Sequence, residues 1–349
     1  MNAIRAILYL FLVMMAVIVS CTQEQSQFHK GFPETIHVVS QQESFDKALM
    51  HYPFRVKIND SALFVMDLHP LKYYCHEFEY PSLKYKSSFA PKGKGPQELM
   101  GAENIIVRPN SSVYILDANR QKIFEHDYND HVQISPIVEL SEELIRSLDF
   151  TLYNDSIFIV PDYSGINRFY FINRDGKIVR KEGKIPGKKD DVADPARAQA
   201  WRSFVHYNPN NKILALATQL GEVIEIYDLQ NNTVNVVMGP NGEPKYRVRY
   251  GYAEPVGIMG YSDVFVSDNY IYAIFWGHNF DQINSGDSLP EGGNAIHVFD
   301  LKGKPVRQYL LNCHITGFYI EELKGLIIGL DVNSDQQLVK LEMNPTDKI

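Results

Sequence analysis

The sequence predicts an all-β protein, a six-bladed β-propeller made of four-stranded blades. Three observations predict this fold. A strand-like pattern recurs six times along the 349 residues. Each repeat contains a short apolar run, rich in the β-branched and aromatic residues that favour strands and too short for a typical helix. Each repeat also has room for four strands, which is the content of one propeller blade.

The strongest element of each repeat is a turn followed by an apolar run. The six runs are NDSALFVMD (59–67), NSSVYILD (110–117), NDSIFIVPD (154–162), NNKILALAT (210–218), DNYIYAIFW (268–276) and KGLIIGLD (324–331). Inner strands of a blade are covered on both faces by neighbouring blades, so they should be continuously apolar instead of alternating. These runs are therefore expected to be inner strands.

A second strand-like element follows each run, and several of these end in residues that tolerate tight turns. They occupy residues 73–80, 122–128, 168–176, 223–232, 295–303 and 337–343. Another candidate strand precedes each apolar run, and a more polar fourth strand follows the second element, as in KIVRKEGKI (177–185). A β-sandwich would not repeat six times at this length, and a parallel β-helix needs a shorter period. Seven or eight blades remain the alternative count.

The last repeat supplies only three strands before the chain ends at Ile349. We expect TIHVVS (35–40) to supply the fourth, so that an N-terminal strand closes the ring and leaves no free sheet edge. Residues 43–52, which end before Pro53, are expected to form a short linking helix.

The N-terminus carries an export signal. Residues 1–20 hold one charge, Arg5, before an apolar stretch that is short for a membrane span. Ile18, Val19 and Ser20 precede Cys21, an arrangement that resembles the bacterial lipobox, which implies a lipid on Cys21 and a membrane as partner. A plain secretory signal and an uncleaved anchor are the alternatives. We expect a signal peptide over 1–20, a polar tether over 21–33 and the propeller over 34–349.

Thr22 instead of Asp after the lipidated cysteine resembles outer-membrane sorting, so we expect a lipid-anchored protein of the cell envelope at the outer membrane, on its periplasmic or its surface face. The remaining cysteines, Cys75 and Cys313, lie far apart in the sequence. They could form a disulfide in an oxidising compartment or remain two buried thiols. Their spacing is not that of a metal site.

The loops are unequal, and the long ones all belong to one rim of the predicted propeller. They are residues 90–104, 186–202, 239–263 and 277–294. Long loops on a rigid scaffold commonly carry function. Arginine beside aromatic residues suits an interface or a small anionic or planar ligand. The candidate ligand-binding residues of this rim are Trp201, Arg202, Arg247, Tyr250, Trp276 and His278.

A structural interpretation of the same residues is also open. The arginines of YRVRYGY (246–252) could be solvated, and the two tryptophans could pack the tops of blades. Asp194 and Pro195 resemble a helix N-cap and first-turn proline, which would place Trp201 and Arg202 on a short helix of this rim.

Composition and motifs exclude several function classes. With 34 Lys+Arg against 42 Asp+Glu the formal net charge is −8, which argues against nucleic-acid binding. No nucleophile elbow, zinc-protease, P-loop or dinucleotide motif is present, and we predict no cofactor and no metal. Asp67, Asp117, Asp162 and Asp331 end apolar runs. They could form an axial calcium ring, but aspartate at a strand end usually caps the following turn.

The stretch Gly93-Lys94-Gly95-Pro96-Gln97-Glu98, the lipobox and the six repeats together resemble the TolB-like six-bladed propeller lipoproteins of gram-negative bacteria. Those families often have glycine where this chain has Gln97. We expect Gly93 and Gly95 to adopt unusual backbone angles and Pro96 to stiffen the loop.

The resemblance implies a scaffold that binds something and brings no catalytic residues. We therefore expect a lipid-anchored envelope module that binds an envelope protein, a glycan or a small anionic ligand through its loop-rich rim. The alternatives are a calcium-dependent hydrolase resembling propeller lactonases, with its site on the axis, and a structural subunit of an envelope complex.

Overall fold

The computed structural model describes residues 23–42, 50–59, 61–108, 112–128, 134–187, 194–285 and 288–343. The signal peptide, Cys21 and most of the expected linking helix lie outside these residues. Within the described part of the chain, no helix is both long and apolar enough to cross a membrane.

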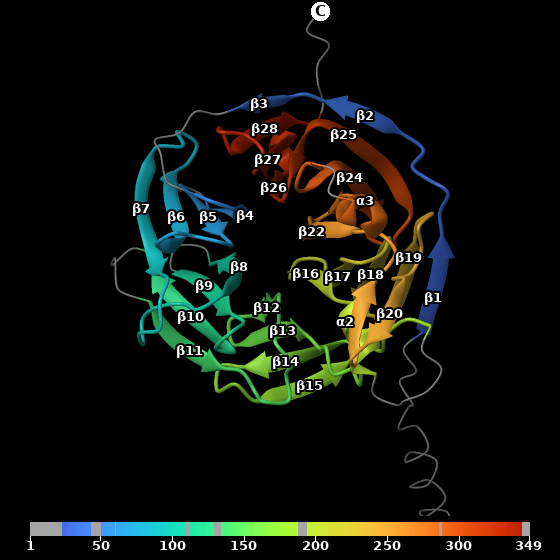
Figure 1. The fold of residues 1–349 in the computed structure, drawn as a ribbon, viewed down its shortest axis with the longest axis horizontal. Helices are drawn as coiled ribbons and strands as arrows, with labels where there is room; N and C mark the ends of the chain where they lie inside the picture. The colour runs from blue at the N-terminus through green and yellow to red at the C-terminus, as the bar shows by residue number, and fades with distance from the viewer. Residues whose placement is uncertain are drawn as a thin grey trace, which may run out of the picture.

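Six sheets stand in a ring around a central axis (Figure 1). Blade 1 contains β4 (Pro53–Asn59), β5 (Ala62–Asp67), β6 (Tyr73–Glu79) and β7 (Tyr85–Pro91). Blade 2 contains β8 (Ala102–Val107), β9 (Ser112–Asp117), β10 (Lys122–Asp127) and β11 (Ser135–Glu139). Blade 3 contains β12 (Thr151–Asn154), β13 (Ile157–Pro161), β14 (Phe169–Asn173) and β15 (Ile178–Glu182).

The second half of the ring repeats this order. Blade 4 contains β16 (Ser203–Asn208), β17 (Ile213–Thr218), β18 (Val223–Asp228) and β19 (Thr233–Met238). Blade 5 contains β22 (Tyr261–Val266), β23 (Tyr270–Phe275), β24 (Gly293–Asp300) and β25 (Pro305–Ile315). Blade 6 contains β26 (Gly317–Glu321), β27 (Leu326–Leu330), β28 (Leu338–Glu342) and β3 (Ser40–Gln42). The predicted six-bladed propeller is confirmed.

The six apolar runs form the second strand of each blade, as their composition predicts. Every residue of β5, β9 and β17 is buried. The reason is that neighbouring blades pack on both faces of these strands, so neither face can be polar. The outer strand β15 is partly or fully exposed along its whole length.

The N-terminal segment runs around the outside of blades 4 to 6 (Figure 1). β1 (Gln23–Phe28) pairs in parallel with β19, and β2 (Thr35–Val38) pairs in parallel with β25, so each adds a fifth strand to its blade. β3 pairs antiparallel with β28 and closes the ring. An N-terminal strand therefore does close the ring, but its residues are 40–42 instead of 35–40.

The tether expected over residues 21–33 needs a correction in its described part, because residues 23–28 are a strand. The segment is polar and lacks an alternating pattern since it lies on the outer edge of blade 4, where Glu24, Gln25 and Ser26 are exposed. Its pairing uses backbone groups, which every sequence has. Local sequence therefore gave no signal for it.

The long loops contain most of the remaining regular structure. The helix α2 (Pro195–Ala200) begins as predicted, since the Asp194 side chain accepts the Arg197 backbone N–H at 3.0 Å and proline stands in the first turn. The hairpin of β20 (Tyr246–Arg249) and β21 (Tyr252–Pro255) lies in the loop between blades 4 and 5, and α3 (Phe280–Asn284) lies within blade 5. A 3-10 turn, η1 (Glu322–Lys324), connects two strands of blade 6.

The glycine-rich loop after blade 1 is structured by Glu98. Its carboxylate accepts the Gly95 backbone N–H at 2.7 Å, and a Cβ on Gly93 would lie 2.0 Å from a Glu98 oxygen. Neither glycine has a positive φ, so the expectation of unusual backbone angles is wrong. A side chain at position 93 would have to displace the Glu98 carboxylate, which accepts the Gly95 backbone N–H.

Candidate functional site

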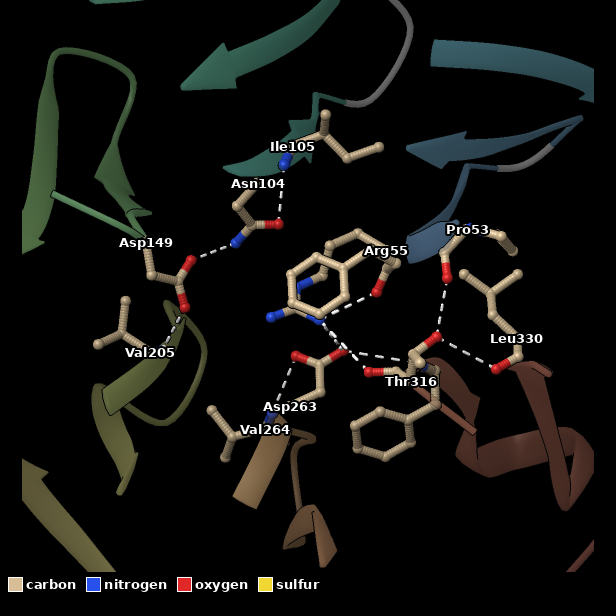
Figure 2. A network of polar contacts seen from close by, with 12 residues as sticks. Pro53, Arg55, Asn104, Ile105, Asp149, Val205, Asp263, Val264, Thr316 and Leu330 are labelled. Carbon is tan, nitrogen blue, oxygen red and sulfur yellow. Dashed lines mark hydrogen bonds and ion pairs between the residues drawn. The ribbon is translucent and has the colours of Figure 1, made fainter. Parts of the chain in front are cut away.

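A buried polar network lies at the centre of the ring, between the innermost strands of the blades (Figure 2). Arg55 of β4 is 1% exposed, and its guanidinium lies over the rings of Phe54 and Phe204, at 3.8 and 4.7 Å from their centroids. Its Nη1 donates to the Phe54 carbonyl at 2.9 Å and lies 3.8 Å from an Asp263 oxygen. The centre of the ring thus holds a paired cation.

Three side chains of the network connect neighbouring blades. Asn104, Asp149 and Asp263 each accept the backbone N–H of the residue that follows. Asn104 of blade 2 also donates to Asp149 of blade 3. The second oxygen of Asp149 accepts the Val205 N–H of blade 4 at 2.7 Å. Burial raises the pKa of Asp149 to about 6, although Arg55 acts in the opposite direction. These side chains connect blades and leave little capacity for a ligand.

The strand-end aspartates cap turns. Asp67 accepts the backbone N–H groups of Tyr52 and His69, both at 2.9 Å. Asp117, Asp162 and Asp331 likewise accept backbone N–H groups of the turns that follow their strands. Within the described ranges, no three His, Cys, Asp or Glu side chains are grouped as a metal site would require. The capping interpretation of these residues is the one that the geometry supports.

A cavity of about 260 Å³ lies beside this network, among the loops of the rim that carries the long excursions. Its wall contains residues from five blades and includes many aromatic side chains. The lining residues are Tyr52, Phe54, Leu68, Glu103, Leu148, Tyr163, Arg202, Ser203, Phe204, Gln219, Met259, Tyr261, Ser262, Trp276, Glu291, Gly292 and Thr316. Ligand sites are commonly apolar cavities of this kind with a few polar groups.

Backbone hydrogen bonds position one wall of the cavity. The Arg202 carbonyl accepts from Gln219, the Gln219 carbonyl from Gly260, and the Gly260 carbonyl from Trp276, at 2.9, 2.7 and 2.9 Å. A Cβ on Gly260 would lie 1.9 Å from the Gly221 carbonyl oxygen, so only glycine fits there. The chain of bonds joins loops of blades 4 and 5 and fixes Arg202 and Trp276 relative to each other.

Three polar atoms of this wall are buried and lack a hydrogen-bond partner among the described residues. They are Arg202 Nε, Ser262 Oγ and Trp276 Nε1. Burial lowers the pKa of Arg202. Leaving a buried donor unpaired is costly, so such atoms commonly mark a place where a ligand or ordered water binds.

The carboxylates of the wall already have partners. Glu103 forms an ion pair with Arg146 at 3.3 Å, and burial raises the pKa of Glu103. Glu291 is exposed and accepts a hydrogen bond from the Tyr52 hydroxyl at 3.2 Å.

The structure divides the six candidate rim residues into three groups. Arg202 and Trp276 line the cavity, and the His278 ring packs edge-on against Trp276 with 5.7 Å between centroids. Arg247 and Tyr250 are exposed on the β20–β21 hairpin, away from the cavity lining, and Tyr250 is 88% exposed. Trp201 is 2% exposed and belongs to the core between blades 3 and 4. The packing interpretation therefore holds for Trp201.

Sequence reasoning missed most of the cavity wall. Phe54, Glu103, Phe204 and Tyr261 lie within the first two residues of an innermost strand, and Thr316 directly precedes another. Aligning the six repeats at the start of their first strands would have grouped these positions. The residue type at these positions varies between repeats, from Phe54 and Phe204 to Glu103, so no common motif marks them.

Solved structures with the same fold have low sequence identity to this chain. A Bacteroides fragilis protein described as exported matches with a TM-score of 0.55 and 9% identity, over 91% of this chain and 98% of its own. A DUF4221 family member from Bacteroides vulgatus gives 0.58 and 12%, over 87% and 97%. The calcium-binding protein regucalcin from Agrobacterium tumefaciens gives 0.54 and 12%, over 88% and 95%. These identities show the fold alone.

No curated protein matches the sequence. The sequence does match the family described as TolB-like 6-blade propeller-like over residues 31–323, which is most of the propeller described above. With six blades observed and this match over more than half of its length, the chain belongs to the TolB-like six-bladed propeller family.

Proposed function

We propose that this propeller is a lipid-anchored binding module of the cell envelope that takes a small ligand in its axial cavity. The observation that carries the proposal is the set of three buried, unpartnered polar atoms on an aromatic wall, Arg202 Nε, Ser262 Oγ and Trp276 Nε1. An apolar cavity with a few convergent polar groups is the arrangement by which most small-molecule sites fix and orient a ligand. The axial aspartates, by contrast, are engaged in joining blades and capping turns.

The envelope location is part of the proposal and is supported by the N-terminal sequence. The apolar stretch that ends in Ile18, Val19, Ser20 and Cys21 resembles a lipoprotein signal, and one structural neighbour is described as exported. Several acyl chains on one cysteine would give firm attachment, because each buried methylene contributes about 0.8 kcal/mol. We place the protein at the outer membrane because Thr22 follows the cysteine.

Membrane fractionation tests the anchor. Cys21→Ser should move the protein from the membrane fraction to the soluble fraction, and mass spectrometry of the native chain should find acyl groups on Cys21. Unchanged membrane retention of the serine variant would contradict lipid anchoring, without bearing on the cavity.

Thermal unfolding tests the cavity. The full-length chain, purified in detergent, is heated with size-separated envelope extracts. A ligand at 100 times its Kd stabilises the folded state by about 2.7 kcal/mol, so a small-molecule fraction should raise the unfolding temperature. Trp276→Phe removes the indole N–H while keeping an aromatic ring, and it should reduce that rise. A rise that Trp276→Phe leaves intact would contradict recognition in the cavity.

A second candidate function is protein docking through the β20–β21 hairpin. Val248, Tyr250 and Tyr252 are 64%, 88% and 67% exposed on it, beside the exposed Arg247. Exposed aromatic and arginine side chains are enriched at protein interfaces. The paired variant Arg247→Ala with Tyr250→Ala should then abolish binding of a protein fraction and leave the small-molecule shift unchanged. Loss of both shifts would mean that the hairpin and the cavity act as one site.

A further inference from the structure

We infer that the axial cavity selects a small organic carboxylate with a flat apolar body. This inference rests on the proposed function, and it adds the chemical class of the ligand to it. Four features of the cavity carry it: the donors, the unpaired positive charge, the partners of the acidic residues, and the size and lining of the space.

The unpartnered groups are mainly donors. An arginine Nε and an indole Nε1 carry hydrogen-bond donors and no acceptor, whereas the Ser262 hydroxyl can do either. A ligand that satisfies Arg202 and Trp276 must therefore present acceptor oxygens to this wall. Ammonium groups and other groups that only donate cannot satisfy them.

The charge of Arg202 distinguishes it from the fully buried arginines. Arg168 lies 2.7 Å from Glu225, and Arg55 lies 3.8 Å from Asp263. Arg202 is half-buried and forms no ion pair within the described part of the chain; its titratable neighbour is Tyr163. A buried charge without a partner is destabilising, and a carboxylate can accept two parallel N–H bonds from a guanidinium. An anionic ligand would complete the pattern that the other buried arginines follow.

The acidic residues of the wall do not cancel this charge. Glu103 forms an ion pair with Arg146 at 3.3 Å, which offsets part of its negative charge. Glu291 is exposed, so solvent screens it, and one of its oxygens accepts from Tyr52. One unpaired cation suits a ligand with a single negative charge better than a multiply charged phosphate.

The space and its lining define the rest of the ligand. A volume of about 260 Å³ corresponds to roughly nine water molecules at about 30 Å³ each, so the ligand has on the order of ten non-hydrogen atoms. Phe54, Phe204, Tyr163 and Tyr261 are among the rings that line it. Flat apolar groups stack on such rings.

Three probes of nearly equal shape test the class. Benzoate, benzamide and benzylamine are titrated by calorimetry into the full-length chain in detergent. Benzoate should bind at least about tenfold more tightly than benzamide, and benzylamine should bind more weakly than either. Arg202→Gln should reduce benzoate affinity to the level of benzamide, while Arg202→Lys should keep part of the preference. Arg120→Gln is the matched control, because Arg120 is on the same rim, pairs with Asp117 and is outside the cavity lining.

Each contrary outcome identifies what fails. Equal affinity for benzoate and benzamide, lowered in Trp276→Phe and unchanged in Arg202→Gln, would overturn the carboxylate class and leave the cavity as a binding site. Preference for benzylamine would mean that Glu103 or Glu291 selects a cation, and it overturns the class as well. Binding of none of the three probes also overturns it, and the extract experiment with Trp276→Phe then decides the proposed function separately. The probe comparison on the unaltered chain holds even if an Arg202 variant fails to fold.

Discussion

Removing Arg168 should destabilise the propeller strongly, because this residue forms a completely buried ion pair between blades 3 and 4. Both side chains of the Arg168–Glu225 pair are 0% exposed. Arg168 Nε donates to both carboxylate oxygens of Glu225 at 3.0 Å, and Nη2 donates to one of them at 2.7 Å. Nη2 also donates to Ser203 Oγ at 2.6 Å.

The expected magnitude follows from what Arg168→Met leaves behind. Glu225 would stay buried, and among the described residues the Tyr227 hydroxyl, at 3.0 Å, would be its remaining side-chain donor. Breaking a buried pair by removing one partner costs about 3–5 kcal/mol, a large part of the roughly 5–15 kcal/mol by which domains are stable. Replacing both charges by methionine should cost much less, about 1–3 kcal/mol for the hydrogen bonds left unmade at Ser203 and Tyr227.

Urea unfolding of the wild-type chain, both single variants and the double variant measures this coupling. The matched control is Arg249→Met, which breaks the exposed Arg249–Glu254 pair of 3.7 Å and should change the free energy of unfolding by less than about 1 kcal/mol. If the losses of the two single variants simply add in the double variant, the pair is not coupled, and the reasoning from burial is refuted.

Three further predictions concern titration, thiols and turn capping. Burial lowers the pKa of His297 from 6.5 to about 3, so between these values only the unfolded chain binds the proton and stability falls as the pH falls. His297→Phe should lose less stability from about pH 7 to about pH 4 by urea unfolding, and an unchanged pH dependence would contradict this. Cys75 and Cys313 are free thiols, and burial raises the pKa of both, to about 11 for Cys313. Neither thiol should therefore react quickly with a thiol reagent until the chain unfolds. Rapid labelling of Cys75 in the native protein would refute its burial. Asp67→Ala removes the acceptor of the Tyr52 N–H and should lower the free energy of unfolding by about 1–3 kcal/mol. Calcium or EDTA should leave the unfolding temperature of the unaltered chain unchanged. A calcium-dependent rise would count against turn capping.

Much of the propeller could be predicted from the sequence, because burial on both faces of an inner strand requires a continuous run of apolar residues. A strand such as β17 is apolar at nearly every position, since blades cover both of its sides. The start of α2 could also be predicted, because its cap is formed by Asp194 and the backbone of Arg197, three residues away. Local interactions of this kind involve residues that lie close together in the sequence.

Neither the N-terminal strands on the outside of the ring nor the cavity could be predicted from local sequence in this way. β1 pairs through its backbone at an exposed edge, so its side chains carry no period that marks a strand. The candidate rim set put Trp201, which is core, together with Arg202 and Trp276, which line the cavity. Sequence proximity could not separate the neighbours Trp201 and Arg202.

The sequence alone therefore predicted six blades, the order of the four strands that follow one another along the chain in blades 1 to 5, and the rim that carries the long loops, because each of these depends on local composition and spacing. The tertiary structure decided which residues share the axial cavity and which atoms there lack partners. The wall of this cavity contains residues from the strand ends and loops of five blades, such as Phe54, Glu103 and Trp276, and only closure of the ring brings them together.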